Sequence, residues 1–120
     1  MTQRVLVVDD SSLQRTIITG ALGDHFEVVG EAENGQEAVE IFEEKEPDLV
    51  TMDIMMPEMD GVEATGEIKN RTDDTKVMMC TSVEQAEKMK EAVRAGADEY
   101  VTKPFDEDEL LDTATTLVGS

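Results

Sequence analysis

Five short apolar runs alternate along the chain with longer segments in which apolar residues recur three or four positions apart. The first run, Val5–Val8, is continuous and mostly β-branched, which is typical of a strand buried on both faces. The remaining predicted strands lie at residues 26–29, 48–52, 76–80 and 100–102. The pattern therefore predicts five strands, each followed by an amphipathic helix.

The five predicted helices are marked by their ends as well as by their apolar faces. Ser11–Gln14 and Asp106–Glu109 have the form of capping boxes that open the first and last helices. Asn34–Gly35 is turn chemistry before the second helix, while Pro57 and Gly61 stop the third strand. The side chains expected to face the core, helix by helix, are Leu13, Ile17 and Ala21; Ala38, Ile41 and Phe42; Val62 and Ile68; Ala86, Met89 and Val93; and Leu110, Ala114, Leu117 and Val118.

Alternation of strand and helix predicts a parallel sheet, because right-handed βαβ connections place the helices on its two faces. The expected fold class is therefore a doubly wound α/β fold. No repeat, low-complexity tract or Gly/Ser/Pro-rich linker interrupts the chain, so a single domain over residues 1–120 is predicted. In such sheets the functional crevice lies beyond the carboxyl ends of the strands. The search for a site narrows to polar residues that end a strand.

The composition excludes several classes of function. A content of 39% apolar and 32% charged residues is that of a globular domain, and no apolar stretch approaches the roughly 18 residues that span a bilayer. The single cysteine, Cys80, cannot form an internal disulfide, which favours a reducing, cytoplasmic setting. With 10 Lys+Arg against 29 Asp+Glu, the formal net charge is −19. A surface that binds nucleic acid needs cationic side chains to neutralise phosphates, so nucleic acid is not an expected partner.

The acidic residues are dispersed from Asp9 to Asp112 rather than gathered in a tail. A net charge of about 2–8 in magnitude already keeps a small domain soluble, so this excess is far larger than solubility requires. Self-repulsion of this size destabilises a compact state unless salt screens it. The balance is typical of proteins from salt-loving, archaeal organisms; an ordinary acidic regulator is the alternative.

Polar residues end four of the predicted strands and are expected to converge at one edge of the sheet. They are Asp9–Asp10, Asp53, Thr81–Ser82 and Lys103–Pro104. Two carboxylates about 4 Å apart repel by roughly 4 kcal/mol at an effective dielectric near 20, so three at one edge call for a cation among them. Carboxylate and carbonyl oxygens are the ligands of hard cations, and Mg²⁺ takes few protein ligands and keeps waters for a phosphate. The sequence therefore predicts a Mg²⁺ site.

In these motifs the chain resembles the receiver domains of two-component response regulators, and among them the stand-alone, CheY-like chemotaxis type. The resemblance covers essentially the whole chain. It rests on residues 7–11, 53–61, 81–82 and 100–105, which occur in the family's order and at family-like spacing. It implies a flavodoxin-like (βα)5 fold whose parallel strands lie in the order 2-1-3-4-5.

The resemblance also implies a role for each acidic residue at the edge. Asp53 would be the phosphoacceptor. Asp9, Asp10, Asp53 and the backbone carbonyl of Met55 would form the Mg²⁺ site, with Asp9 acting through water. The residue-level chemistry agrees, because phosphoryl transfer needs an in-line nucleophile and neutralisation of charge, and a carboxylate can be that nucleophile.

Three further side chains receive roles from the same resemblance. Thr81 would be the hydroxyl that closes on the phosphoryl group, Lys103 the cation paired with its oxygens, and Tyr100 an aromatic switch. The Lys103–Pro104 peptide bond would be cis. The expected output face comprises the fourth helix, fifth strand and fifth helix, around Lys88, Glu91, Val93, Glu99, Tyr100 and Phe105.

The implied function is that of a phosphorylation-activated signalling switch. The chain would act as a monomer, receive a phosphoryl group from a histidine kinase of the CheA type, and then bind a motor-side or adaptor protein. It would not be a classical enzyme, although it would promote its own phosphorylation and dephosphorylation.

Two alternatives stay open. A Mg²⁺-dependent phosphohydrolase with an aspartyl intermediate wants a second acid two residues after the nucleophile, where this chain has Met55. The chain could also be the receiver of a larger DNA-binding regulator, although a complete chain is expected.

Overall fold

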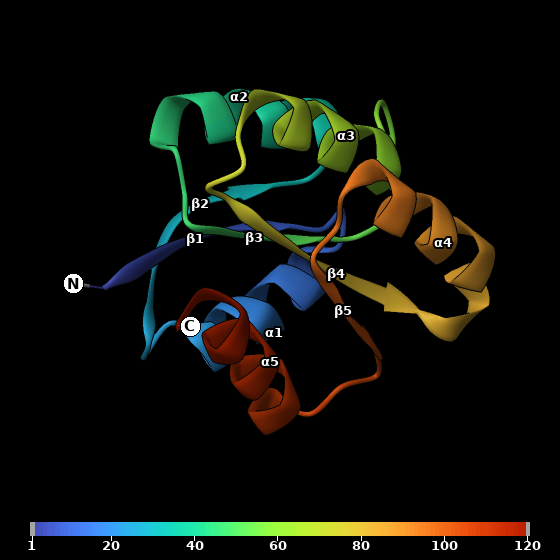
Figure 1. The fold of residues 1–120 in the computed structure, drawn as a ribbon. Helices are drawn as coiled ribbons and strands as arrows, with labels where there is room; N and C mark the ends of the chain where they lie inside the picture. The colour runs from blue at the N-terminus through green and yellow to red at the C-terminus, as the bar shows by residue number, and fades with distance from the viewer. Residues whose placement is uncertain (1, 120) are drawn as a thin grey trace.

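The computed structural model of the chain describes residues 2–119, so Met1 and Ser120 lie outside the described residues. Within this range five strands and five α-helices alternate, and one short 3-10 turn precedes the fourth helix (Figure 1). The elements in chain order are β1 (Gln3–Val8), α1 (Ser12–Leu22), β2 (Phe26–Ala32), α2 (Gly35–Lys45), β3 (Leu49–Met52), α3 (Gly61–Arg71), β4 (Lys76–Ser82), η1 (Val83–Gln85), α4 (Ala86–Ala95), β5 (Glu99–Lys103) and α5 (Glu107–Gly119). None of the helices among the described residues combines the length and the apolar character needed to cross a membrane.

The five strands form one parallel sheet in the order β2-β1-β3-β4-β5, which confirms the predicted doubly wound fold and strand order. Helices α1 and α5 cover one face of the sheet, and α2, α3 and α4 cover the other (Figure 1). The order of the strands reverses at β1, which has β2 on one side and β3 on the other. The carboxyl ends of β1 and β3 therefore flank the point where sheets of this kind bind their ligands.

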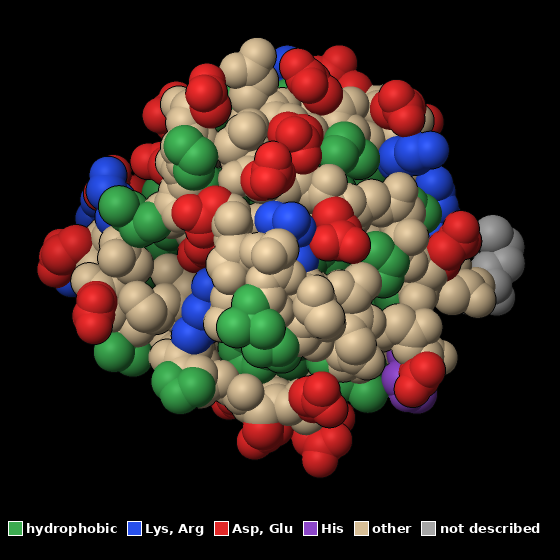
Figure 2. Space-filling view, turned by 180° about the vertical axis from the view of Figure 1, so that it is seen from behind, with side chains coloured by type: hydrophobic (Ala, Val, Ile, Leu, Met, Phe, Trp, Pro, Cys, Tyr) green, Lys and Arg blue, Asp and Glu red, His purple; other side chains and the backbone are tan. Residues whose placement is uncertain are grey.

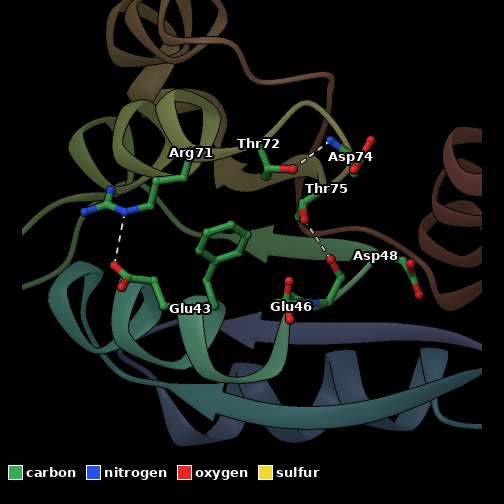
Figure 3. A pocket seen from close by; sticks show the side chains of 9 residues that line it. Glu43, Glu46, Asp48, Arg71, Thr72, Asp74 and Thr75 are labelled. Carbon is green, nitrogen blue, oxygen red and sulfur yellow. Dashed lines mark hydrogen bonds and ion pairs between the residues drawn. The ribbon is translucent and has the colours of Figure 1, made fainter.

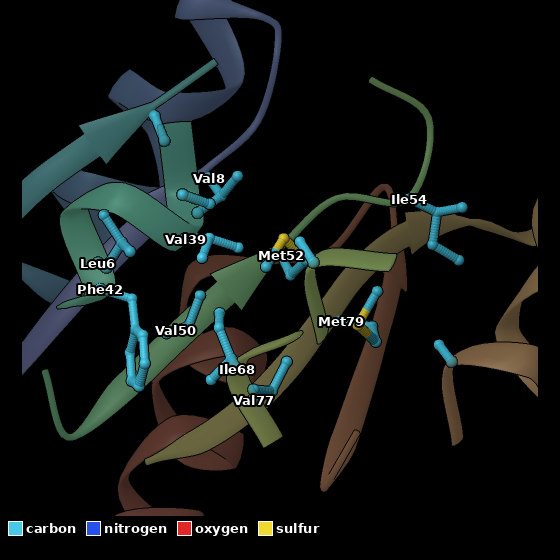
Figure 4. Packing of buried hydrophobic residues seen from close by; sticks show 14 residues of the cluster. Leu6, Val8, Val39, Phe42, Val50, Met52, Ile54, Ile68, Val77 and Met79 are labelled. Atoms are coloured by element: carbon cyan, nitrogen blue, oxygen red, sulfur yellow. The ribbon is translucent and has the colours of Figure 1, made fainter. Parts of the chain in front are cut away.

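Side chains that alternate along the strands fill two apolar cores, one on each face of the sheet. Along β1, Leu6 and Val8 point into the core beneath α2, α3 and α4, whereas Val5 and Val7 point towards α1 and α5. Figure 4 shows the first of these cores, in which Phe42 of α2 packs with side chains of the central strands. Burial on both faces is the reason that the central strands have continuous apolar sequences.

Helix α1 buries a face one residue away from the predicted one, whereas in α4 the predicted Met89 packs against the core and Val93 does not. In α1 the structure buries Leu22 and leaves Leu13 and Ile17 66% and 37% exposed, respectively. In α4 it buries Ala92 and leaves Val93 55% exposed. One residue turns a helix by about 100°, so α1 carries two neighbouring apolar stripes. In α1 the stripe with the bulkier Leu22 buries more apolar surface, and in α4 the small Ala92 packs into the core shared with α3.

Strands β1, β2, β4 and β5 are longer than predicted, because polar residues continue the ladders beyond the apolar runs, and β1 begins at Gln3. β2 extends to Ala32 as an edge strand, in which polar side chains are tolerated. β4 ends at Ser82 and β5 at Lys103, and these two residues are paired across the strands. β3 begins one residue later than predicted, at Leu49.

The predicted helix caps at Ser11 and Asp106 are confirmed. The Ser11 hydroxyl accepts the amide hydrogen of Gln14 at 3.3 Å, and the Asp106 carboxylate accepts that of Glu109 at 2.7 Å. The Ser11 amide itself donates to the carboxylate of Asp9 at 2.9 Å. The start of α1 is therefore joined directly to the residue that follows β1.

Candidate functional site

Three carboxylates meet where β1 and β3 end side by side. Asp9 and Asp10 follow β1, Asp53 follows β3, and one carboxylate oxygen from each lies within 4.8 Å of the others. Asp9 and Asp53 are only 1% and 8% exposed, whereas Asp10 is an exposed residue. The acidic cluster expected from the strand ends is therefore present.

Asp9 is held by hydrogen bonds at its amide and at both carboxylate oxygens. Its amide donates to the carbonyl of Ala32 at 3.0 Å. Its Oδ1 accepts from the amide of Ser11 at 2.9 Å, and its Oδ2 accepts from Nζ of Lys103 at 2.8 Å. Because these partners are in β2, at the cap of α1 and in β5, Asp9 fixes the position of the site relative to three elements.

Asp53 is buried beside a second negative charge. Its amide donates to the carbonyl of Val8 at 3.1 Å, and its Oδ1 accepts the amide hydrogen of Ile54 at 2.8 Å. Burial, followed by the charge of Asp9, raises the pKa of Asp53 from 3.8 to about 6, although Lys103 opposes this rise. The negative charge of Asp53 is therefore incompletely compensated by the protein, and a further cation would stabilise it.

Lys103, the last residue of β5, reaches across the sheet edge to two carboxylates. Its Nζ lies 2.8 Å from Oδ2 of Asp9 and 3.7 Å from Oδ1 of Asp53. Burial lowers the pKa of Lys103, but the hydrogen bond to Asp9 and the charges of Asp53 and Asp9 outweigh it and raise the pKa. Lys103 is therefore a cation at neutral pH. The Lys103–Pro104 bond is cis in the structure, as the resemblance implied.

The hydroxyl of Thr81 is buried without a hydrogen-bond partner among residues 2–119. Thr81 is 1% exposed and lies near the end of β4, two residues beyond Met79, which pairs with Met52 of β3. An unsatisfied buried hydroxyl costs about 1–3 kcal/mol. The described residues therefore leave this donor without a partner.

Tyr100 lies on β5 with 52% of its surface exposed. Its ring borders a shallow, mainly apolar groove that Met89 and Val93 of α4 also line. The strand register connects this groove to the site, because Thr81 pairs with Thr102, and Tyr100 and Thr102 lie on the same side of β5. Along β5, only Val101 separates Tyr100 from Thr102, the residue that is paired with Thr81.

The loop between β3 and α3 is held tightly against the end of β3. The amide of Gly61 donates to the carbonyl of Ile54 at 2.8 Å. A Cβ atom at Gly61 would lie 1.9 Å from the carbonyl oxygen of Asp53, so no larger residue fits without moving the backbone. The side chain of Met55 in this loop is 54% exposed. The role predicted for Met55 involves its carbonyl alone, so this exposure leaves that prediction as it stands.

A second hollow lies at the opposite edge of the sheet, next to the amino ends of β3 and β4 (Figure 3). Its walls are tied together by Arg71, whose Nε lies 3.1 Å from Glu43, and by Thr75, whose hydroxyl donates to the carbonyl of Pro47 at 2.7 Å. The residues that line it are Phe42, Glu43, Glu46, Pro47, Asp48, Arg71, Thr72, Asp74 and Thr75. None of them is part of the carboxylate cluster.

The donor set of the cluster fits a hard divalent cation. All three side chains offer carboxylate oxygens, and such ligands suit Mg²⁺ rather than softer metals. The raised pKa of Asp53 is a second observation in favour, because burial and then the charge of Asp9 disfavour its ionised form, which a bound cation would stabilise.

One polar side chain at the site was missed by the sequence analysis. Nη1 of Arg15 in α1 donates to the backbone carbonyl of Asp9 at 2.7 Å, and its Nε pairs with Glu31 of β2 at 3.0 Å. An arginine on an amphipathic helix is ordinarily interpreted as a solvated charge. Both of its partners belong to other elements, so no local sequence pattern could have identified this contact.

Comparisons with known proteins agree on the family. Residues 5–115 match the model of the response regulator receiver domain. The chemotaxis protein CheY of Halobacterium salinarum is 50% identical over 118 residues, which are 98% of each chain. The chemotaxis protein CheY of Bacillus subtilis is 46% identical over 113 residues, covering 93% of this chain and 94% of the relative.

Solved structures give the same result. The response regulator domain of Thermotoga maritima CheB superposes with a TM-score of 0.88 at 36% identity, covering 100% of this chain and 98% of the other. A chain of the CheX–CheY complex from Borrelia burgdorferi, which contains BeF3 and magnesium, has a TM-score of 0.88 at 28% identity, covering 96% and 88%.

Proposed function

The chain belongs to the response regulator receiver domains, and on this basis we propose that Asp53 accepts the phosphoryl group that switches it. As a CheY-like receiver of a two-component chemotaxis system, the protein is a signalling switch that works with a kinase and with downstream proteins. The observation that carries the proposal is the position of the Asp53 carboxylate, which is buried, beside Asp9, and 3.7 Å from the cation of Lys103.

Asp53 acts as the nucleophile. Its Oδ1 accepts the Ile54 amide, which leaves Oδ2 as the oxygen that attacks the phosphorus of a phosphohistidine. The new O–P bond forms as the P–N bond breaks, and the electron pair of that bond stays on the imidazole nitrogen. The product is an aspartyl phosphate on a side chain that lies at the carboxyl end of β3.

Charge neutralisation at the transferred group comes from two sources. Asp9, Asp10, Asp53 and the carbonyl of Met55 would hold Mg²⁺, which when bound supplies positive charge next to the phosphoryl oxygens. Lys103 supplies the second charge from the protein itself. Its hydrogen bond to Asp9 keeps the ammonium group within reach of the atoms that become negative.

Thr81 and Tyr100 convert the modification into a change of surface. A phosphoryl group adds charge and acceptor oxygens, and the hydroxyl of Thr81 is a buried donor without a partner among the described residues. Once Thr81 moves towards the phosphate, the space behind it can accept the ring of Tyr100. Phosphorylation then shifts a population that already contains some active form.

The output face is formed by α4, β5 and α5, where Val93 and Tyr100 are exposed apolar side chains. We propose that a CheA-type histidine kinase and a motor-side or adaptor protein bind to this face. The complex of a relative with CheX supports a role in binding other proteins. The protein acts as a monomer in the cytoplasm, and its acidic surface suits a salt-rich cell.

Phosphorylation of Asp53 is tested by incubating the protein with Mg²⁺ and acetyl phosphate. We expect a mass gain of one phosphoryl group, which borohydride trapping and peptide mass spectrometry should locate at Asp53. Asp53→Asn should abolish the gain, because the amide is a poor nucleophile. EDTA should prevent labelling of the wild-type protein as well.

Asp60→Asn is the control for the loss of an aspartate close to the site, since Asp60 caps α3 through the Glu63 amide at 2.9 Å and is not in the cluster. This variant should be labelled like the wild type. Labelling of Asp53→Asn at the wild-type rate would overturn the assignment of the acceptor.

A further inference from the structure

Arg15 connects three elements at the edge of the carboxylate cluster. Its side chain extends from the fourth residue of α1 and is 14% exposed. Nη1 donates to the carbonyl oxygen of Asp9 at 2.7 Å, and Nε lies 3.0 Å from Oε1 of Glu31, near the end of β2. The guanidinium group therefore bridges the loop after β1 to the neighbouring strand.

The place of this arginine is unfavourable on general electrostatic grounds. The amino end of a helix carries partial positive charge, so a cation in the first turns is disfavoured. The chain has only 10 Lys+Arg against 29 Asp+Glu, yet one of these scarce cations is largely buried at the start of α1. The hydrogen bonds from Arg15 to the Asp9 carbonyl and to Glu31 offset this unfavourable position of its charge.

The bond to the Asp9 carbonyl matters because that carbonyl belongs to the peptide between Asp9 and Asp10. The peptide group is planar, so a hydrogen bond that fixes its oxygen also fixes the direction in which the chain enters Asp10. The carboxylate of Asp10 is exposed, and no hydrogen bond or ion pair holds it among residues 2–119. With no such partner, the place from which the Asp10 side chain starts is set by the backbone, which fixes its Cα–Cβ direction, and its rotamer then completes the approach to the cluster.

We propose that Arg15 is a positioning residue for the metal site: by holding the Asp9–Asp10 peptide, it aims the carboxylate of Asp10 at the cluster and so sets the affinity for Mg²⁺. This inference rests on the proposed function, in which these carboxylates hold Mg²⁺. Residues that orient metal ligands from outside typically change metal affinity by about 10- to 100-fold when they are replaced.

The test is the affinity of the metal-free protein for Mg²⁺, measured by isothermal titration calorimetry at fixed ionic strength. We expect Arg15→Gln to raise the Kd about tenfold. The direction is decisive, because removing a cation near three carboxylates would by charge alone lower the Kd. Arg15→Lys, which keeps the charge but loses the forked geometry, should also weaken binding, whereas charge alone predicts no change.

Arg71→Gln is the matched control, because Arg71 also bonds a backbone carbonyl and a carboxylate, at the opposite edge of the sheet. Its Kd should equal that of the wild type or be slightly lower. Glu31→Gln leaves the bond to Asp9 in place and should weaken binding less than Arg15→Gln. Circular dichroism of each metal-free variant monitors folding.

Wild-type affinity, or tighter binding, in both Arg15 variants would overturn the positioning role while leaving the proposed function intact. Loss of folding in both would make Arg15 a residue of the fold and also overturn the inference. Failure of the wild-type protein itself to bind Mg²⁺ would remove the proposed function and the inference together.

Discussion

Replacing Asp53 with asparagine is expected to stabilise the metal-free protein near pH 8 by about 2–3 kcal/mol, and to change its stability little near pH 3. The cause is the pKa of Asp53, which burial and then Asp9 raise from 3.8 to about 6. A pKa difference of one corresponds to about 1.4 kcal/mol.

The direction follows from proton binding. Between pH 3.8 and about 6 the folded protein holds a proton on Asp53 that the unfolded chain has released. The stabilisation from this proton is fully present below the lower value and is lost as the pH rises through the higher one. Asparagine carries no charge at any pH, so the variant does not lose this stability.

Urea denaturation of both proteins without Mg²⁺, at a series of pH values, measures the difference. Asp73→Asn, which removes an exposed aspartate outside the cluster, controls for the loss of one charge. Added Mg²⁺ should stabilise the wild type much more than Asp53→Asn. A ligand stabilises a protein by binding its native state, and the variant lacks one of the carboxylates proposed to hold Mg²⁺. A stability difference that does not vary with pH would contradict the account of Asp53.

The melting temperature of the wild-type protein should rise by on the order of 10 °C between about 0.01 M and 1 M KCl. The formal net charge is −19, and Asp and Glu side chains are scattered over the face in Figure 2 with few Lys or Arg among them. The molecule measures 32 × 30 × 27 Å. At the lowest salt the Debye length is about 30 Å, so charges on opposite sides of the molecule still repel one another.

The salt series needs one arm with fixed Mg²⁺ and one with EDTA, because salt also weakens the binding of Mg²⁺ and thereby its stabilising effect. Glu40→Gln, which removes one exposed charge from α2, should raise the melting temperature at low salt more than at high salt. A flat series in both arms would contradict the interpretation of the composition as halophilic and favour an ordinary acidic regulator.

The fold was predictable from the alternation of strands and helices. The carboxylate cluster was predictable from the residues that end the strands. Alternation gave the parallel sheet, and parallel strands necessarily bring Asp9 and Asp53 to one edge. The buried face of α1 was not predictable in the same way, because Leu13 and Ile17 form a stripe as regular as the one that contains Leu22. Only packing against the sheet distinguishes the two.

The contact of Arg15 with Asp9 was out of reach for a different reason. It joins a helix to the loop before it and to a second strand, and its partner is a backbone carbonyl, which has no sequence signature. The unsatisfied hydroxyl of Thr81 has no sequence signature either. The resemblance gave it a role, but only the packing around β4 shows that the donor has no partner within the described part of the chain.

A phosphoryl group on Asp53 is expected to change the surface formed by α4, β5 and α5. Amide chemical-shift mapping with Mg²⁺ and beryllofluoride, a phosphate mimic, tests it most directly. We predict shifts at the cluster that continue through Thr81 to Tyr100 and to α4. In Thr81→Ala the shifts should remain at the cluster and be lost at Tyr100. Shifts confined to the surroundings of Asp9, Asp10 and Asp53 in the wild-type protein would contradict the switch.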